Sequence, residues 1–175
     1  MENHIDYYFD IVSPYSYIAS MLIEDVARRG NTKVNWKPFL LGGVFNAVGT
    51  KDPPGVHPTK KPYLQKDLQR LSGHLKIPIK MPADFPARTV LAMRTLCGFN
   101  PDEIVQATQI LFEAYWVNNQ DIADPKVLAS IVGKDAVERA GIQEIKDALF
   151  QSTDEAVRRG AFGAPTFFVK DEMFF

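Results

Sequence analysis

The chain has 175 residues, of which 46% are hydrophobic, and its 20 Lys and Arg nearly balance its 21 Asp and Glu to give a formal net charge of −1. This composition predicts one globular domain, or one domain with a large insertion, and it excludes a disordered chain. The balance of charges does not indicate binding to nucleic acid or to an anionic membrane surface, so a small-molecule ligand is expected.

The numbers and positions of cysteine and histidine indicate which kinds of site the chain can form. Cys97 is the one cysteine of the sequence, which excludes an intrachain disulfide and dithiol redox catalysis, and it falls in an apolar helical run where a small buried side chain is expected. His4, His57 and His74 are far apart in the sequence, so no metal is implied. The N-terminus has no signal-peptide pattern and no apolar run reaches about 18 residues, which predicts a soluble, cytoplasmic protein.

The first elements in chain order are a strand, a helix and a strand. Apolar side chains alternate over residues 5–11 and predict a strand with one strongly apolar face. A helix is expected over residues 14–29, with Gly30 just past its end. A second alternation over residues 33–38 predicts another strand. This order predicts a right-handed βαβ unit with a parallel strand pair.

Ser13 stands where the first strand meets the helix, directly before Pro14. Serine is a preferred N-cap, and a proline at the first helical position needs no hydrogen-bond partner. The free N–H groups and the positive end of the helix dipole favour an anion at this point. Ser13 is therefore either an ordinary helix cap or part of an anion site. Ser16 is expected only to contact the backbone of the first turn, and Tyr15 and Tyr17 are secondary site candidates.

From about residue 42 to residue 153 the strand pattern disappears and helical periodicity recurs. Leucines over residues 64–75 and apolar residues over residues 104–115 form stripes at helical spacing. Helix starts are expected at Asn100, with Glu103 in the third helical position, and at Asp124, which precedes a proline. The middle of the chain is therefore predicted to be a helical insertion.

The remaining segments are a long loop early in the insertion and the C-terminal part of the chain. The loop over residues 49–55 is the least regular piece and a candidate binding loop. Residues 153–159 predict a short helix ended by Gly160, and residues 166–175 predict a hairpin. Pro165, just before the hairpin, is either a plain turn proline or a cis-proline.

The Ser13-Pro14-Tyr15-Ser16 helix start and the late Ala164-Pro165-Thr166 turn are laid out as in thioredoxin-like proteins of the DsbA type, with serines in place of both active-site cysteines. The chain resembles the branch of that superfamily that comprises 2-hydroxychromene-2-carboxylate isomerases and kappa-class glutathione transferases. Further segments that carry the resemblance are residues 39–45, 53–55, 60–68, 77–79, 91–94 and 160–163. The resemblance implies an α/β thioredoxin-like (DsbA-type) domain made of residues 1–42 and 153–175, with a large helical insertion domain at 43–152.

The same resemblance implies that glutathione is the cofactor. Ser13 would donate a hydrogen bond to the glutathione thiolate, assisted by the helix N-terminus. Ala164, before a cis Pro165, would pair with the peptide backbone of glutathione, and Phe175 would contribute to the same site. In the family the hairpin leads into an acidic turn and a final helix. A chain that ends at Phe175 is therefore expected to lack one glutathione anchor, to bind glutathione poorly and to associate.

For a second substrate, the family places the pocket between the thioredoxin-like part and the insertion. This placement implicates Phe45, Lys51, Lys60, Tyr63, Phe85 and Arg88. A lysine or arginine there would pair with a substrate carboxylate, whereas the alternative for Lys60 and Arg88 is a solvated charge at a helix end. The apolar side chain of Phe45 makes this position similar to that of the kappa class, because the isomerases have a basic residue there. The loop over residues 49–55 is one residue longer than its kappa-class counterpart and lacks its asparagine.

Three functions follow from this resemblance. The favoured one is a glutathione-dependent isomerase similar to 2-hydroxychromene-2-carboxylate isomerase, in which the thiolate adds reversibly to an unsaturated aromatic acid. The first alternative is a kappa-class glutathione transferase, for conjugation or peroxide reduction. The second is a non-enzymatic thioredoxin-fold binding module that kept the proline turn. The enzymes would act on a small aromatic or electrophilic substrate, without nucleic acid or membrane, as a homodimer.

Overall fold

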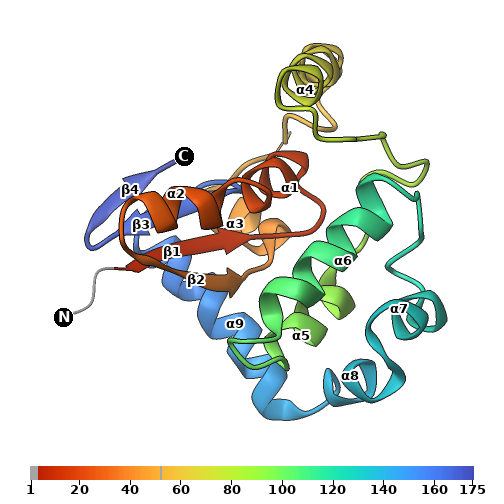
Figure 1. The fold of residues 1–175 in the computed structure, drawn as a ribbon. Coiled ribbons are helices and arrows are strands. Elements are labelled where there is room, and N and C mark those ends of the chain that lie inside the picture. The colour runs from red at the N-terminus through yellow and green to blue at the C-terminus, as the bar shows by residue number, and fades with distance from the viewer. Residues whose placement is uncertain (1–3, 52) are drawn as a thin grey trace.

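The computed structural model describes residues 4–51 and 53–175 and contains a four-stranded sheet of order β2-β1-β3-β4 (Figure 1). β1 (His4–Phe9) pairs in parallel with β2 (Lys33–Pro38) and antiparallel with β3 (Thr166–Val169). β4 (Glu172–Phe174) pairs antiparallel with β3 and completes the sheet. The predicted parallel strand pair and the predicted C-terminal hairpin are both confirmed.

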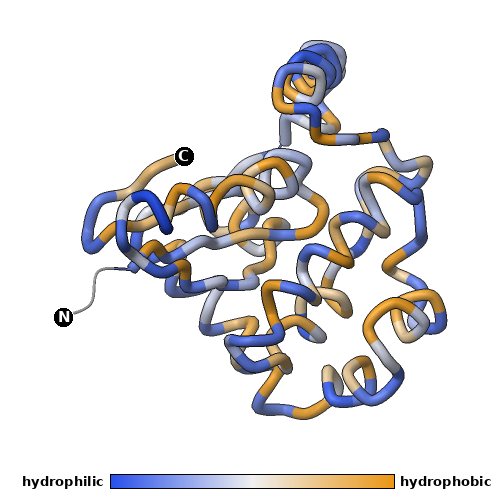
Figure 2. The backbone as a smooth tube through the Cα atoms, viewed as in Figure 1, coloured by the Kyte–Doolittle hydropathy of each residue, from blue (hydrophilic) through white to orange (hydrophobic). Residues whose placement is uncertain are grey.

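Nine helices occur in the described part of the chain, seven of them between β2 and β3. They are α1 (Pro14–Ser20), α2 (Ile23–Arg29), α3 (Leu41–Val48), α4 (Lys60–Leu75), α5 (Val90–Cys97), α6 (Ile104–Trp116), α7 (Pro125–Val132), α8 (Lys134–Arg139) and α9 (Gln143–Arg158). The predicted helical character of the middle of the chain is therefore confirmed. Hydrophobic and hydrophilic positions alternate along α6 to α8, so each of these helices has an apolar side (Figure 2).

The helix expected over residues 14–29 is broken, because Met21 and Leu22 form a turn between α1 and α2. Their N–H groups donate to carbonyls three residues back, at Ile18 and Ala19, which tightens the helix and ends it. Gly30 follows α2 as predicted, but its φ is −83°, and the left-handed residue is Asn31, with a φ of 49°. The single continuous helix was therefore a wrong prediction.

The short helix expected over residues 153–159 is the last part of α9, which begins at Gln143. Leu149 and Ala156, two turns apart, are both buried, so one apolar face runs along the whole helix. Gly160 follows the last turn with a φ of +102°, as the predicted helix end requires. The predicted start of this helix was wrong and its predicted end is confirmed.

At the two other predicted helix starts, a side-chain oxygen accepts hydrogen bonds from backbone N–H groups. Asp124 caps α7, because its Oδ1 accepts hydrogen bonds from the N–H groups of Lys126 and Val127. Asn100 Oδ1 accepts from the N–H groups of Asp102 and Glu103, both at 3.1 Å, in a turn that leads into α6. Both predicted starts are therefore correct to within one turn.

Both faces of β1 are covered, whereas the alternation predicted one strongly apolar face. Tyr7 and Phe9 face a large core shared with α1, α2 and α6, while Tyr8 packs into a second cluster formed with α3 and α9. Tyr8 on this second face is fully buried. The sheet is thus the middle of three layers, with α1 and α2 on one face and α3 and α9 on the other (Figure 1).

The insertion shares its core with the sheet. α6 supplies Leu111, Phe112 and Trp116 to the cluster that also holds Tyr7 and Phe9. The Phe9 and Phe112 rings lie 6.0 Å apart between centroids. The predicted boundaries at 42/43 and 152/153 fall inside α3 and α9, so the division into two domains stays a prediction.

We expect Asp6→Asn to lower the free energy of unfolding by about 1–3 kcal/mol at neutral pH. The Asp6 carboxylate accepts a charge-assisted hydrogen bond from Arg159 at 2.6 Å and a second hydrogen bond from Asn35 at 2.9 Å. Burial raises the pKa of Asp6, but the hydrogen bonds from Arg159 and Asn35 outweigh it, so the pKa lies below its ordinary value of 3.8. The charged pair therefore stabilises the protein above about pH 4, and this contribution is lost as the pH falls through the folded-state pKa. Urea unfolding of both proteins across this range should show the difference narrowing in acid, and a difference that stays constant would contradict the role of the charge.

Candidate active site

Ser13 caps α1 at the point where β1 has ended. Its Oγ accepts a hydrogen bond from the N–H of Ser16 at 3.2 Å, and its hydroxyl donates to the carbonyl oxygen of Ala164 at 3.0 Å. The side chain is only 4% exposed. Ser13 is therefore a helix cap, as one prediction required, and it also joins α1 to a turn that lies 151 residues later in the chain.

The turn before β3 is built from Gly163, Ala164 and Pro165. The Ala164–Pro165 peptide bond is cis, as predicted, and Thr166 Oγ1 donates to the carbonyl of Gly163 at 2.8 Å. Phe175 lies against this turn, because a Cβ on Gly163 would come within 2.9 Å of the Phe175 ring. The residue is 68% exposed, so Phe175 lies on the outer side of the turn.

Asp10 lies directly behind the Ser13 turn and was not identified from the sequence as a site residue. Its carboxylate accepts from the N–H of Val12 at 3.1 Å and from the N–H of Leu41, the first residue of α3, at 2.9 Å. Its carbonyl oxygen accepts from the N–H of Ser13. Burial raises the pKa of Asp10, against the hydrogen bonds that favour the carboxylate. The one feature of the sequence that could have identified Asp10 is its position, as an acidic residue at the end of a strongly apolar strand.

The secondary candidates hold α1 to the start of the insertion. Tyr15 donates its hydroxyl to Asp67 Oδ2 on α4 at 2.6 Å, and Tyr17 donates to the carbonyl of Pro78 at 3.1 Å. Burial, followed by the hydrogen bond to Asp67, raises the pKa of Tyr15, and the nearby Tyr63 adds to the shift. Ser16 contributes through its backbone, since its N–H donates to Ser13 Oγ and its carbonyl accepts from the Tyr7 hydroxyl. Tyr15, Asp67 and Tyr63 therefore lie together on the α4 side of α1.

We expect Tyr15→Phe to loosen α4 without changing the Ser13 turn. The bond to Asp67 joins two helices, and α4 is set apart from α6 to α9 (Figure 1). Losing it should cost about 1 kcal/mol and raise the rate of amide exchange in α4. Hydrogen-exchange mass spectrometry measures this directly, with Tyr17→Phe as the matched control on the other side of α1. Equal exchange in α4 for Tyr15→Phe and the parent would contradict the role of this contact.

Two of the candidates for a second substrate lie beside the core. Phe45 on α3 packs against the buried cluster of Tyr8 and Phe168, against which Val12 and Ala164 also pack. Phe85 packs against Trp116 at a centroid distance of 5.8 Å, and a Cβ on Gly55 would come within 2.9 Å of its ring. The loop that contains Gly55 is therefore brought to Phe85. Asp52 of this loop lies outside the described residues.

The three cationic candidates point to solvent. Lys51, Lys60 and Arg88 are exposed, and within the described residues no ion pair involves their side chains. Tyr63 is also 64% exposed. The structure therefore brings Phe45 and Phe85 to the neighbourhood of the core and leaves the charged candidates at the surface.

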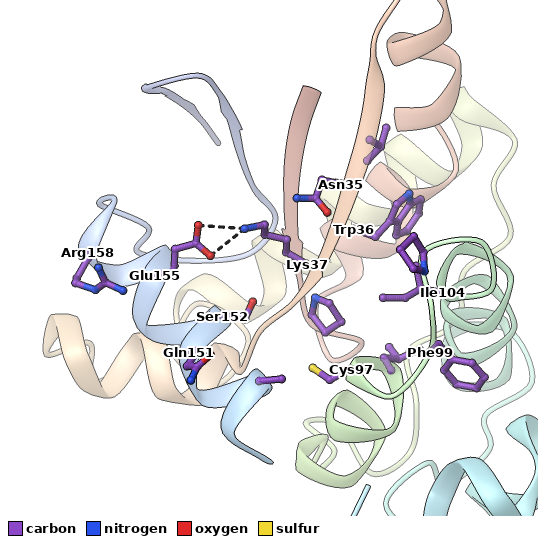
Figure 3. Close-up of a pocket in the computed structure, with 15 residues that line it drawn as sticks. Asn35, Trp36, Lys37, Cys97, Phe99, Ile104, Gln151, Ser152, Glu155 and Arg158 are labelled. Carbon is purple, nitrogen blue, oxygen red and sulfur yellow. Dashed lines mark hydrogen bonds and ion pairs between the residues drawn. The ribbon is translucent and has the colours of Figure 1, made fainter. Parts of the chain in front are cut away.

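A cavity of about 580 Å³ lies elsewhere, between the outer edge of β2 and helices α5 and α9 (Figure 3). Lys37 and Glu155 pair across it at 2.9 Å, and Cys97 lines it. Burial raises the pKa of the Cys97 thiol to about 12, so this side chain behaves as the predicted core residue. Ser13, Ala164 and Pro165 do not line this cavity, so it is separate from the candidate site.

Among the described residues, no group of three or more His, Cys, Asp or Glu side chains could hold a metal ion. Within the same residues, no helix combines the length and apolarity that crossing a bilayer requires.

Comparison with known proteins places this geometry in a family. A family model described as a DSBA-like thioredoxin domain matches residues 4–175. Human glutathione S-transferase kappa 1 is 32% identical over 178 residues, which cover 92% of this chain and 78% of the relative. The 2-hydroxychromene-2-carboxylate isomerase of Sphingobium xenophagum is 29% identical over 185 residues, covering 99% of this chain and 92% of the relative.

Among solved structures, a 2-hydroxychromene-2-carboxylate isomerase superposes with a TM-score of 0.84 at 24% identity, covering 98% of this chain and 88% of that one. The fold expected from the sequence is therefore confirmed, since both sequence and structure match over nearly the whole chain. The chain belongs to the DsbA-like thioredoxin domain family, in the branch of the kappa-class glutathione transferases and the 2-hydroxychromene-2-carboxylate isomerases.

Proposed function

We propose that this protein is a glutathione-dependent enzyme, and in the first place an isomerase of the 2-hydroxychromene-2-carboxylate type. The observation that carries the proposal is the hydrogen bond from Ser13 Oγ to the Ala164 carbonyl at 3.0 Å. It brings together a hydroxyl donor, the N-terminus of α1 and a main-chain acceptor on the edge of a turn. Relatives named as glutathione transferases and as isomerases of this type support the choice.

Ser13 would change its hydrogen-bond partner when glutathione binds. In this structure its hydroxyl donates a hydrogen bond to the Ala164 carbonyl. A bound peptide would use the same carbonyl as the acceptor for its N–H. When the cysteinyl N–H of glutathione takes the Ala164 carbonyl, rotation about the Cβ–Oγ bond of Ser13 frees the hydroxyl to donate to the sulfur. The Ser16 N–H can stay bonded to Oγ throughout, because it uses a lone pair and not the proton.

The chemistry begins with loss of the thiol proton to solvent. The thiolate is stabilised by the Ser13 hydroxyl and by the positive end of the α1 dipole. In the isomerase, the sulfur adds to an unsaturated carbon of the substrate, the carbon–carbon π electrons move onto the conjugated carbonyl, and the former double bond can rotate. Return of those electrons expels the thiolate and restores the double bond, so glutathione is not consumed.

A kappa-type transferase is the second candidate, and the position of Phe45 favours it. This apolar ring packs against the same buried cluster as Val12 and Ala164, and an apolar side chain at the site would suit a neutral electrophile. In that reaction the carbanion formed on addition takes a proton from solvent, and the thioether is released. Counting free thiol during turnover separates the two reactions. Constant thiol supports the isomerase, loss of one thiol per product supports the transferase, and no turnover with either substrate class would overturn both.

The charged candidates give a further test of substrate class. Lys51→Met, Lys60→Met and Arg88→Met should each raise KM for an acidic aromatic substrate about 10- to 100-fold if that side chain turns inward and pairs with the carboxylate. Lys134→Met is the matched control, because Lys134 pairs with Glu138 on α8 at 3.3 Å. Unchanged KM values for all three variants would favour a neutral electrophile, and with it the transferase.

The proposal includes glutathione as cofactor, a small aromatic or electrophilic substrate, a cytoplasmic location and a homodimer. A balanced net charge of −1 and a single cysteine support a small-molecule enzyme of a reducing compartment. Light scattering on a sizing column measures the oligomeric state, and a monomer at micromolar concentration would contradict the dimer.

A further inference from the structure

A second cavity, of about 280 Å³, lies between α3, α5 and α9. Its walls are mostly apolar and include Leu40, Val90, Leu149, Phe150 and Val157. Gly43 and Ala47, one turn apart, line it from α3, whereas Val44 and Phe45 on the same helix do not. Ser13, Ala164 and Pro165 do not line it either, so the cavity is separate from the candidate active site.

Three ionisable side chains also line this cavity, and two of them are uncompensated cations. Asp154 pairs with Arg158 at 2.8 Å, so its charge is neutralised. Arg94 and Lys146 have no ion pair within residues 4–51 and 53–175. The Nε atom of Arg94 is buried, and it has no hydrogen-bond partner in the described part of the chain. A buried guanidinium N–H without a partner is costly, so this arrangement indicates a missing acceptor.

We propose that the cavity binds a small apolar carboxylate, such as an arylcarboxylate or a short-chain fatty acid. The carboxylate would lie on Arg94, whose planar guanidinium donates two parallel hydrogen bonds, with Lys146 as the second cation. The apolar body would lie against Val90, Leu149 and Phe150. A volume of about 280 Å³ is at the small end for a ligand pocket, which suits one aromatic ring or a short alkyl chain.

The wall chemistry selects this ligand class over other anions. Inorganic phosphate would leave the apolar walls uncovered, and glutathione would bring two carboxylates and two amide groups into a cavity with few polar partners. Phe150 is 73% exposed, and an apolar ligand would cover part of its ring. The site is independent of the proposed glutathione chemistry, because none of its lining residues belongs to the Ser13 turn.

The test is calorimetric titration of the whole chain with benzoate and hexanoate, and with benzyl alcohol and 1-hexanol as uncharged counterparts. We expect the carboxylates to bind at least about tenfold more tightly than the alcohols, and Arg94→Met and Lys146→Met each to weaken carboxylate binding about 10- to 100-fold. Lys126→Met is the control, because Lys126 lies on α7 and does not line the cavity. No binding of either carboxylate, or equal binding by Arg94→Met and the parent, would overturn the proposal.

Two further measurements distinguish carboxylate binding in the cavity from carboxylate binding to exposed cations elsewhere on the surface. Ala47→Phe fills the cavity from its exposed side without changing any charge, so it should remove carboxylate binding. Unchanged affinity would mean that the anion binds outside the cavity. Arg94→Met should not lower the urea midpoint of the ligand-free protein, because its buried Nε has no partner to lose. A lower midpoint would assign Arg94 a structural role and contradict the proposal, whatever the outcome for glutathione.

Discussion

Ser13→Ala is expected to lower kcat/KM for any glutathione-dependent reaction of this protein about 100- to 1000-fold. The substitution removes the hydroxyl that would stabilise the thiolate, and a single preorganised donor to a developing anion contributes about that much. The fold should survive, because the loss of the Ser16 N–H cap costs only about 1 kcal/mol. Steady-state kinetics on the variant, with its urea midpoint measured alongside, separate the two effects.

Ser16→Ala is the matched control for this experiment. Ser16 is fully buried in the same helical turn, but its Oγ has no hydrogen-bond partner in the described structure. Its removal should leave both kinetics and stability close to those of the parent. Equal activity of Ser13→Ala and Ser16→Ala would mean that Ser13 is only the helix cap.

Trp116→Ala is expected to destabilise the protein by about 4 kcal/mol, which is a large part of the stability of a domain of this size. Trp116 is fully buried between Tyr115 and Phe85, and its Nε1 donates to the Ile11 carbonyl at 2.8 Å. The variant leaves a cavity and an unpaired carbonyl in the turn that leads to Ser13. Binding of glutathione should therefore weaken together with stability.

The same variant tests whether the insertion and the sheet unfold together. Fluorescence of Trp36 reports on β2, and far-ultraviolet circular dichroism reports mainly on the helices of the insertion. Because α6 and β1 share one core, both signals should shift to the same lower urea midpoint. Phe150→Ala is the control, since a ring that is 73% exposed should change stability by less than about 0.5 kcal/mol. Separate midpoints for the two signals would contradict a shared core.

The meeting of Ser13 with Ala164 is the part of the site that sequence reasoning predicted best. Each partner has a local signal, since a serine before a proline marks a helix start and a proline before an apolar run marks a turn. Their order along the chain matches one known layout, and the structure joins them by a hydrogen bond at 3.0 Å. The strands were predicted for the same reason, because period-two alternation is a local property.

Contacts that depend on packing between distant elements had no such signal. The bond from Tyr15 to Asp67 and the bond from Trp116 to Ile11 join residues 52 and 105 positions apart, and each side chain alone fits many environments. Asp10 was assigned to the polar side of a strand, because alternation does not reveal that a second layer of helices covers that side. The inward or outward direction of a long side chain such as Lys60 is likewise set by its neighbours in space.

The most direct measurement is the pKa of the glutathione thiol when it is bound to this protein. Thiolate absorbs in the ultraviolet, so a pH titration of the complex at saturating glutathione gives the bound pKa without a second substrate. We expect a value at least one unit below the value of about 8.5 for an ordinary cysteine thiol, because Ser13 and the α1 N-terminus favour the charged form. A bound thiol that titrates at the same pH as free glutathione would contradict it.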